Sequence, residues 1–212
     1  MRIAILVDDP KSWFVKYSTI LKDKLTEKGI ETNEYNNSKE VKDEEICFIL
    51  SCTKILRKEF LEKHRHNIVV HASDLPKGKG FTPLKWQVLE GKNVIPLTLF
   101  EAVEDCDAGP YYLKDQIHFE GYEMLREMQD IMARKIIEMC CTFVDNMEKM
   151  KPVEQTGEST YYRRFTKEDD LIDVNSTIRD LFLRLRIADF DRFPLVFENE
   201  GHKYSLIVNR ID

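Results

Sequence analysis

The first hundred residues alternate between short apolar runs and segments whose apolar residues recur every three or four positions. The apolar runs predict buried strands, and the three-and-four spacing predicts helices that pack against them. Strands are expected at 2–7, 30–35, 46–52, 67–72 and 94–103, and helices at 14–28, 54–64 and 83–90. This alternation predicts an α/β fold with a mainly parallel sheet and right-handed crossovers, in which ligands collect beyond the carboxyl ends of the strands.

A long amphipathic segment at 122–150 contains no proline or glycine, which predicts one connecting helix. The next ten residues are polar and include Pro152 and Gly157. Beyond them, "PLVFE" and "YSLIVN" flank an Asn-Glu-Gly turn, which is typical of a β-hairpin. We therefore expect a main domain at 1–150 and a small C-terminal appendage at 151–212 that contains β structure.

Composition narrows the range of functions. The 212 residues carry a net charge of −6, which disfavours a nucleic acid as the main partner. Five cysteines without a CxxC pair predict neither a disulfide framework nor a zinc site, and we expect no metal. The N-terminal apolar run is too short for a signal sequence or a membrane span, so the expected location is the cytoplasm, without membrane attachment.

Two polar residues end extended segments. His71 closes the run "NIVVHA", and Asp107 lies in the glycine turn after "VIPLTLFEAV". An imidazole beside a carboxylate can act as a general acid and base near neutral pH. The lysine–glycine loop at 77–80 is expected to let the backbone approach a polar ligand closely. His64 and His66 lie in a charged stretch, for which a solvated loop is expected.

Three longer motifs carry a family resemblance. "HASDLPKGKGFTPLKW", "LTLFEAVEDCDAGPYYL" and "GESTYYRRFTKEDDLID" are similar to segments of the formyltransferases that use N10-formyltetrahydrofolate, over about residues 46–173. The resemblance implies a Rossmann-like formyltransferase domain at 1–150. It also implies that His71 is the catalytic base and that Asp107 supports it.

The resemblance further implies a folate pocket between the loop after 46–52 and the Asp107 turn. The residues that would line it are Cys52, Ile55, Leu56, Val103 and Cys106. Apolar side chains there would cover the pterin while backbone groups read its polar edge, although Ile55 and Leu56 also fit an ordinary helix core.

One position departs from the family. Val69 stands where an asparagine normally helps to hold the formyl oxygen, and Asn67 lies on the same strand face but about 13 Å from His71. The imidazolium of His71, a backbone N–H, a water molecule or a side chain from elsewhere could donate to that oxygen instead. A binding-only relative without catalysis is the alternative that this departure leaves open.

The branch of the family decides the acceptor. The transfer RNA branch has a further domain and grips a polyanion, and the glycinamide ribonucleotide branch has a glycine-rich phosphate turn where this chain has "VDDPKSWF". The resemblance is to the short sugar N-formyltransferases of pseudaminic-acid-type pathways, which implies a nucleotide-linked amino sugar as acceptor. The oligomeric state stays open, with a homodimer as one option.

Candidate acceptor contacts are Trp13, which also suits a packing role, Lys77 and Lys79. Arg163 and Arg164 are an anion-binding option, of which one would face the ligand. A function of another class, a hydrolase with Cys52 as nucleophile and His71 as base, requires a partner that lowers the thiol pKa.

Overall fold

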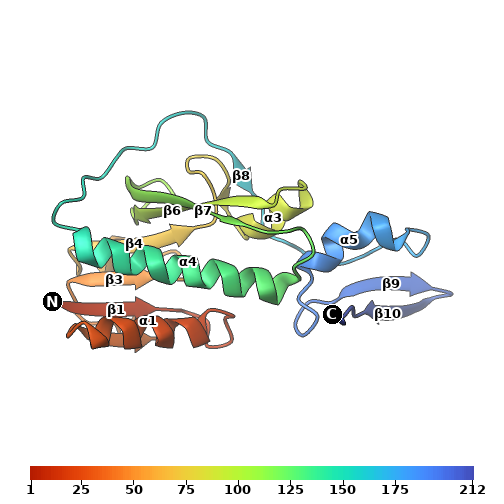
Figure 1. The fold of residues 1–212 in the computed structure, drawn as a ribbon, viewed down its shortest axis with the longest axis horizontal. Helices are drawn as coiled ribbons and strands as arrows, with labels where there is room; N and C mark the ends of the chain where they lie inside the picture. Colours follow the sequence, from red (N-terminus) through yellow and green to blue (C-terminus); the bar gives the residue numbers. More distant parts are fainter.

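The computed structural model describes residues 1–212, whose centre is a six-stranded sheet in the order β2-β1-β3-β4-β6-β7 (Figure 1). Its strands are β1 (Arg2–Leu6), β2 (Glu31–Tyr35), β3 (Ile46–Ile49), β4 (His66–His71), β6 (Val94–Glu101) and β7 (Tyr111–His118). The first four run parallel, and β6 and β7 are antiparallel to their neighbours. The predicted α/β class is confirmed, and β7 is a strand that the sequence analysis did not anticipate.

One face of the sheet carries most of the core. The helices α1 (Val15–Glu27), α3 (Pro83–Leu89) and α4 (Leu125–Asn146) contribute to a cluster of 29 buried residues. In α1, Tyr17, Leu21 and Leu25 repeat every four residues and face the sheet. The helix stops at Gly29, whose positive φ of 77° is a conformation that glycine adopts without steric cost. These local patterns explain why the sequence analysis located α1 correctly.

The opposite face is covered more thinly, by a second cluster of only 6 buried residues that includes Phe60 of α2 (Lys58–Leu61). The helix expected at 54–64 is therefore shorter than predicted. Its first residues are held in a loop because the carboxylate of Asp8, just beyond β1, accepts hydrogen bonds from the backbone N–H groups of Thr53 and Lys54. A buried carboxylate with two such donors outweighs the weak helix propensity of a single turn.

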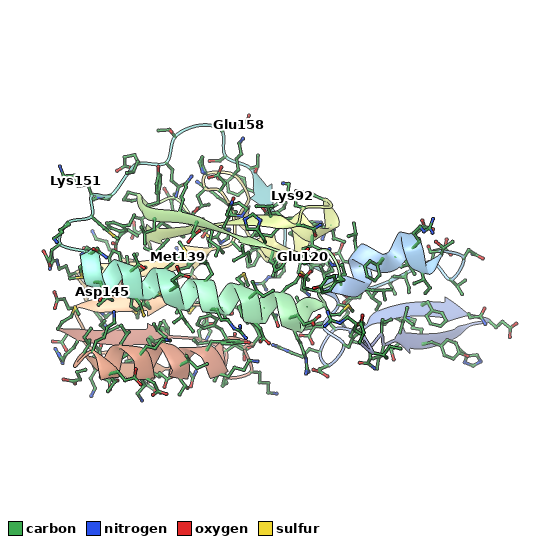
Figure 2. The ribbon with its side chains drawn as sticks, in the orientation of Figure 1. Lys92, Glu120, Met139, Asp145, Lys151 and Glu158 are labelled. Carbon is green, nitrogen blue, oxygen red and sulfur yellow. The ribbon has the colours of Figure 1, made fainter.

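After α4 the chain doubles back over the main domain. Figure 2 marks this connector by Lys151 and Glu158, which lie away from the C-terminal appendage. Val153 pairs with Tyr111 at the start of β7, and β8 (Tyr161–Tyr162) pairs with β5 (Lys79–Gly80). Residues that follow the predicted boundary at 150 thus pack against the loops of the main domain.

The appendage contains α5 (Ile178–Ile187) and the antiparallel hairpin of β9 (Leu195–Asn199) and β10 (His202–Leu206), as the turn signal predicted. It has a small core of its own, formed by Ile172, Leu181, Leu185, Ala188 and Leu195. None of the helices in the structure is both long and apolar enough to span a bilayer.

A buried arginine fixes α5 to the main domain. Arg186 is 2% exposed, and its Nη2 atom lies 3.5 Å from Oε2 of Glu123, at the start of α4. Its Nε donates to the Glu123 carbonyl at 3.1 Å, and Nη1 donates to the Asn93 side chain at 3.2 Å. Burial lowers the pKa of Arg186, and the Glu123 carboxylate opposes that shift. The guanidinium is thus matched by acceptors that offset its desolvation.

We predict that Arg186→Met destabilises the protein by about 3–5 kcal/mol, because the Glu123 carboxylate loses its buried counter-charge. The matched control is Arg192→Ala, which removes a solvent-exposed pair with Asp9 (3.4 Å) and should cost less than about 1 kcal/mol. Urea unfolding monitored by circular dichroism measures both values. Equal losses in the two variants would show that Arg186 does not anchor the appendage.

Candidate active site

His71 is the last residue of β4 and is 9% exposed. Its Nε2 atom lies 2.9 Å from the carbonyl oxygen of Gly78, which can only accept. In the neutral ring the proton is therefore on Nε2, and Nδ1 is the basic nitrogen. Nδ1 makes no hydrogen bond within the protein and is not fully buried. The fold thus sets the tautomer and leaves one nitrogen free to take a proton.

Asp107 lies beside the protonated side of this ring, in the loop between β6 and β7. Its Oδ2 atom is 3.9 Å from Nε2 of His71 and accepts a hydrogen bond of 2.8 Å from the backbone N–H of Gly80. The φ of Asp107 is +54°, in the left-handed region that aspartate tolerates better than most residues. At this distance the carboxylate stabilises an imidazolium electrostatically, without a direct hydrogen bond.

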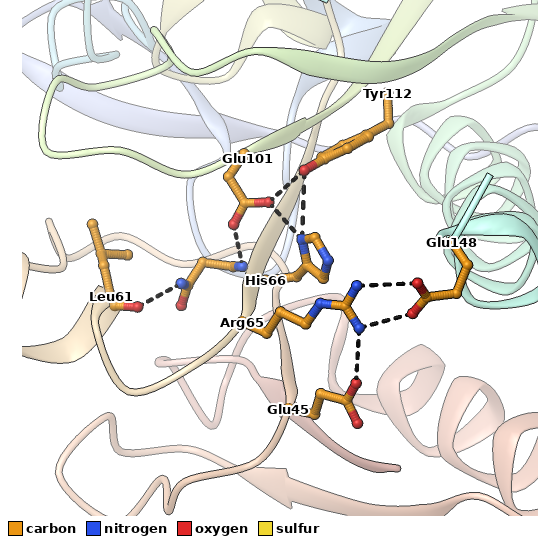
Figure 3. Close-up of polar contacts among 8 residues, drawn as sticks. Glu45, Leu61, Arg65, His66, Glu101, Tyr112 and Glu148 are labelled. Atoms are coloured by element: carbon orange, nitrogen blue, oxygen red, sulfur yellow. Dashed lines mark hydrogen bonds and ion pairs between the residues drawn. The ribbon is translucent and has the colours of Figure 1, made fainter. Parts of the chain in front are cut away.

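The Asp107 loop is held at both ends. At its start, the Glu101 carboxylate accepts from the backbone N–H of Asn67 (2.5 Å), from His66 Nδ1 (3.1 Å) and from the Tyr112 hydroxyl (3.0 Å), as Figure 3 shows. At its end, a Cβ on Gly109 would lie 1.8 Å from the Glu101 carbonyl oxygen. Only glycine fits there, which gives the aspartate–glycine motif a steric reason.

The connector adds contacts that the sequence analysis missed. The Gln155 side chain donates to the carbonyls of Asp107 (3.0 Å) and Gly109 (2.7 Å), and the Thr160 hydroxyl accepts from the Gly78 N–H (2.8 Å). Both residues belong to or adjoin the "GESTYYRR" motif. That motif carried part of the family resemblance. It was therefore the sequence feature that could have predicted that these residues support the site.

The expected solvated loop around His64 and His66 is wrong. His64 is buried, with Nδ1 2.8 Å from the Glu44 carbonyl, and His66 begins β4 and binds Glu101. Arg65, between them, is the outward-facing residue and pairs at 2.8 Å with Glu148, in the turn that follows α4 (Figure 3). His64 and Arg65 thus lie in the bend before β4, where one side chain is buried and the other exposed, and the charged composition of the stretch obscured this difference.

The lysine–glycine loop serves a different purpose from the one expected. A Cβ on Gly78 would lie 2.9 Å from the Tyr162 ring, and one on Gly80 would lie 2.4 Å from the Tyr162 carbonyl oxygen. The glycines let β8 of the same chain approach, and this contact accounts for them without a ligand. Lys77 is exposed, whereas Lys79 is only 7% exposed.

Trp13 lies half-buried at the start of α1. Its ring packs edge-on against Phe14 and Tyr17, with centroid distances of 5.2 and 5.9 Å, and adjoins the main core. This environment accounts for Trp13 as a packing residue and favours that interpretation over acceptor stacking.

The loop after β3 combines apolar side chains with unpaired backbone groups, which suits it to line a binding site for a planar heterocycle. Cys52 and Leu56 pack with Val69 and Ala102 on the thinly covered face, and Ile55 is 61% exposed. The backbone N–H and C=O groups of Ile55 and Leu56 make no hydrogen bond within the chain. Unpaired polar backbone beside exposed apolar side chains fits a pterin, which has flat faces and a polar edge.

Val103 and Cys106 continue this surface from the other loop, and both are exposed. Burial of the sulfur, together with the neighbouring Asp107 carboxylate, raises the pKa of the Cys106 thiol to about 11. Ala102, at the start of this loop, packs against the same cluster as Val69 and as Cys52 and Leu56 of the loop after β3, so both loops adjoin the sheet face on which Val69 lies.

Cys52 lacks the environment of a nucleophile. Burial raises its pKa to about 12, and its Sγ donates to the Leu6 carbonyl at 3.2 Å. A thiol of this kind stays protonated at neutral pH, whereas a catalytic cysteine requires a lowered pKa. This counts against the hydrolase alternative.

Asn67 does not supply the amide donor that the family normally places near His71, and no metal-ligand cluster stands in for it. Asn67 is buried, donates to the Leu61 carbonyl at 2.8 Å and leaves its Oδ1 without a partner. The structure contains no group of three or more His, Cys, Asp or Glu side chains arranged to hold a metal ion.

Comparison with known proteins identifies the family. The pattern of the formyl transferase family matches residues 1–137. The methionyl-tRNA formyltransferase of Thermodesulfovibrio yellowstonii is 30% identical over 145 residues, which cover 67% of this chain and 47% of that protein. The chain thus spans about half the length of this curated relative. The chain belongs to the formyl transferase family, whose members use N10-formyltetrahydrofolate.

Solved structures extend the likeness of the fold. A methionyl-tRNA formyltransferase from Clostridium thermocellum superposes with a TM-score of 0.85 at 20% identity, covering 100% of this chain and 94% of the other. HypX from Aquifex aeolicus in complex with tetrahydrofolic acid superposes with a TM-score of 0.82 at 18% identity, covering 98% of this chain and 37% of HypX. A 4-N formyltransferase from Francisella tularensis superposes with a TM-score of 0.75 at 16% identity, covering 99% of this chain and 98% of the other. At these identities the likeness establishes the fold alone.

We predict that Asp8→Asn weakens tetrahydrofolate binding about tenfold, because the amide removes the charge and one of the two acceptors that hold Thr53 and Lys54. Isothermal titration with tetrahydrofolate measures the affinity. Asp9→Asn is the control, since Asp9 bonds to Lys11 and Arg192 and not to this loop. Unchanged affinity in Asp8→Asn would separate the 51–56 loop from the folate site.

Proposed function

We propose that this enzyme transfers the formyl group of N10-formyltetrahydrofolate to an amino group of a nucleotide-linked amino sugar. The observation that carries the formyl-transfer part is the state of His71. Its Nε2–H is fixed by the Gly78 carbonyl, Asp107 lies 3.9 Å away, and Nδ1 is free. A positioned base of this kind, in a chain of the formyl transferase family, suits attack by an amine on an activated formyl carbon.

His71 would serve both proton transfers. As the C–N bond to the acceptor forms, Nδ1 takes the proton that the amine must lose. The same nitrogen then returns that proton to N10 of the folate, whose bond to the formyl carbon breaks. Asp107 stabilises the imidazolium that exists between the two transfers, and the Gly78 carbonyl keeps the ring in place.

The formyl oxygen needs a donor while negative charge develops on it. Val69 provides none, and Asn67 is committed through its amide nitrogen to Leu61. Once it has taken the amine proton, Nδ1 of His71 is the charged donor that the geometry supplies, and the Asp107 carboxylate lies 3.9 Å from Nε2 of the same ring.

The donor would lie between the loops at 51–56 and 102–107. When bound, N10-formyltetrahydrofolate supplies the activated formyl group. Leu56, Ile55 and Val103 offer apolar contacts to its ring, Cys52 and Cys106 flank them, and free backbone groups offer hydrogen bonds. Asp8 and Glu101 position the two loops without touching the donor.

The acceptor assignment has separate support. The chain has a net charge of −6, which disfavours a large polyanion, yet Lys77 and Lys79 adjoin the loop that holds His71. Neither lysine has a carboxylate within 4.0 Å, so both suit the diphosphate or hydroxyls of a sugar nucleotide. The Francisella tularensis neighbour, of nearly the same extent, is titled a 4-N formyltransferase. We extend the proposal to a 4-amino sugar of a pseudaminic-acid-type pathway.

Methionyl-tRNA is the second candidate acceptor, because the sequence relatives carry that name. Glycinamide ribonucleotide is disfavoured: the turn after β1, where that branch binds phosphate, contains Asp8 and Asp9, and the Asp8 carboxylate already occupies the donors of Thr53 and Lys54. Two carboxylates repel a phosphate at this position.

The proposal predicts release of tetrahydrofolate from N10-formyltetrahydrofolate only when a nucleotide-linked 4-amino sugar is present. Absorbance and mass spectrometry measure folate and formylated sugar across a panel of acceptors that includes methionyl-tRNA and glycinamide ribonucleotide. Formylation of methionyl-tRNA alone would move the assignment to the second candidate. Equal transfer from formyl phosphate without folate would contradict the donor.

We predict that His71→Gln lowers kcat by about two to four orders of magnitude, the range for loss of a general acid–base group. Glutamine can keep a donor near the Gly78 carbonyl while it removes the base, so the fold and the binding of both substrates should change little. Rapid-quench kinetics and ligand titration measure the two effects. Cys52→Ala is the control and should retain most turnover. Near-normal turnover in His71→Gln, or its loss in Cys52→Ala, would contradict the mechanism.

A further inference from the structure

The β5–β8 ribbon adjoins the catalytic pair. The Gly78 carbonyl accepts from His71, and the Gly80 N–H donates to Asp107, so two residues of one short segment contact both groups. Within the ribbon, β8 packs directly on β5, because the Tyr162 carbonyl leaves no space for a Cβ on Gly80. Whatever binds to the outer face of this ribbon is therefore positioned relative to His71.

Two aromatic rings on this ribbon face solvent. Tyr161 is 70% exposed and Phe81 is 43% exposed, and neither ring packs against another aromatic ring. The adjacent Tyr162 behaves differently: its ring stacks on Trp86 at an interplanar angle of 9°, and its hydroxyl donates to Glu90. Alternation along β8 thus directs one tyrosine into the protein and the other out of it.

Cations accompany both exposed rings. The Arg164 guanidinium lies 4.4 Å from the Phe81 ring centroid, and Lys79 Nζ lies 5.9 Å from that of Tyr161. Neither cation has a carboxylate within 4.0 Å, whereas the adjacent Arg163 is paired with Asp169 at 2.5 Å. Phe81 therefore holds a guanidinium that is free to bind an anion.

Lys79 is the less exposed of the two cations, since the residue as a whole is only 7% exposed, and it has no carboxylate partner. Its ammonium opposes the rise that burial imposes on the Cys106 pKa, which places it near the Asp107 loop. Its Nζ atom makes no hydrogen bond within the chain and is not among the fully buried polar atoms, so the ammonium can meet an anionic ligand. In a chain with net charge −6, this local excess of positive charge indicates an anionic ligand beside the catalytic pair.

We propose that Tyr161, Phe81, Arg164 and Lys79 form the nucleotide subsite of the acceptor. Tyr161 stacks on the nucleobase, and the diphosphate lies between Arg164, oriented by Phe81, and Lys79. This assignment rests on the proposed nucleotide-sugar acceptor and specifies where the nucleotide binds. It also gives the tyrosine–arginine part of the "TYYRR" motif a ligand-binding role.

The test measures affinity for UDP and dTDP by isothermal titration on the full chain, with tetrahydrofolate titrated separately. Tyr161→Ala should weaken binding of the preferred diphosphate about 10- to 100-fold, and Tyr161→Phe should retain it because the ring remains. Arg164→Ala should weaken it about tenfold. Arg179→Ala, which removes an exposed cation on α5, should change nothing, and tetrahydrofolate affinity should stay constant in all variants.

The outcomes separate the subsite from the proposed function. If the wild-type enzyme formylates an amino-sugar nucleotide while Tyr161→Ala and Arg164→Ala keep its diphosphate affinity and acceptor KM, the subsite is overturned and the function stands. If the wild-type enzyme binds neither diphosphate and formylates only methionyl-tRNA, the acceptor assignment fails and the subsite fails with it. Selective loss of diphosphate affinity with an intact folate site supports the subsite.

Discussion

The hydrogen bond from the Gly80 backbone N–H to the Asp107 carboxylate joins the two loops on which the active site depends. The Gly78–Gly80 segment holds the His71 ring by the Gly78 carbonyl, and the other loop brings the carboxylate to the same side of that ring. Because the Asp107 carboxylate accepts a hydrogen bond from this backbone group, its position is set before any ligand binds. The proposed acid–base pair is therefore preorganised, which is the main way in which a protein site lowers a barrier by electrostatics.

The same device recurs around the site. Asp8 fixes the loop after β3 through two backbone N–H groups, and Glu101 fixes the start of the Asp107 loop through the Asn67 N–H, His66 and Tyr112. A carboxylate that accepts from backbone donors makes short, charge-assisted bonds, and it positions a loop more rigidly than apolar packing would on this thinly covered face. Three carboxylates thus organise loops of little regular structure around the end of β4, where His71 lies.

Sequence reasoning located the groups that lie at the ends of periodic segments. His71 closes β4 and Asp107 follows β6, as the apolar runs predicted, and the C-terminal hairpin lies where the turn signal placed it. Sequence reasoning failed where a contact with a distant residue overrides the local structural preference. The 54–64 helix starts late because Asp8 captures Thr53 and Lys54, and the loop glycines face Tyr162 instead of a ligand. His64 and His66 were misjudged because the contacts that hold them, to the Glu44 carbonyl and to Glu101, come from distant residues that a charged local composition does not reveal.

The sequence by itself determined the α/β class, the strand on which His71 lies and the turn that contains Asp107, because burial periodicity and glycine or proline punctuation act over a few neighbouring residues. Only the tertiary structure decided which nitrogen of His71 is free, which loops frame the site and which aromatic ring of the "TYYRR" motif faces solvent. Those features depend on contacts across 27 residues, from Gly80 to Asp107, and across 82 residues, from Gly78 to Thr160. Such pairings follow from how the whole chain packs, and local sequence carries no record of them.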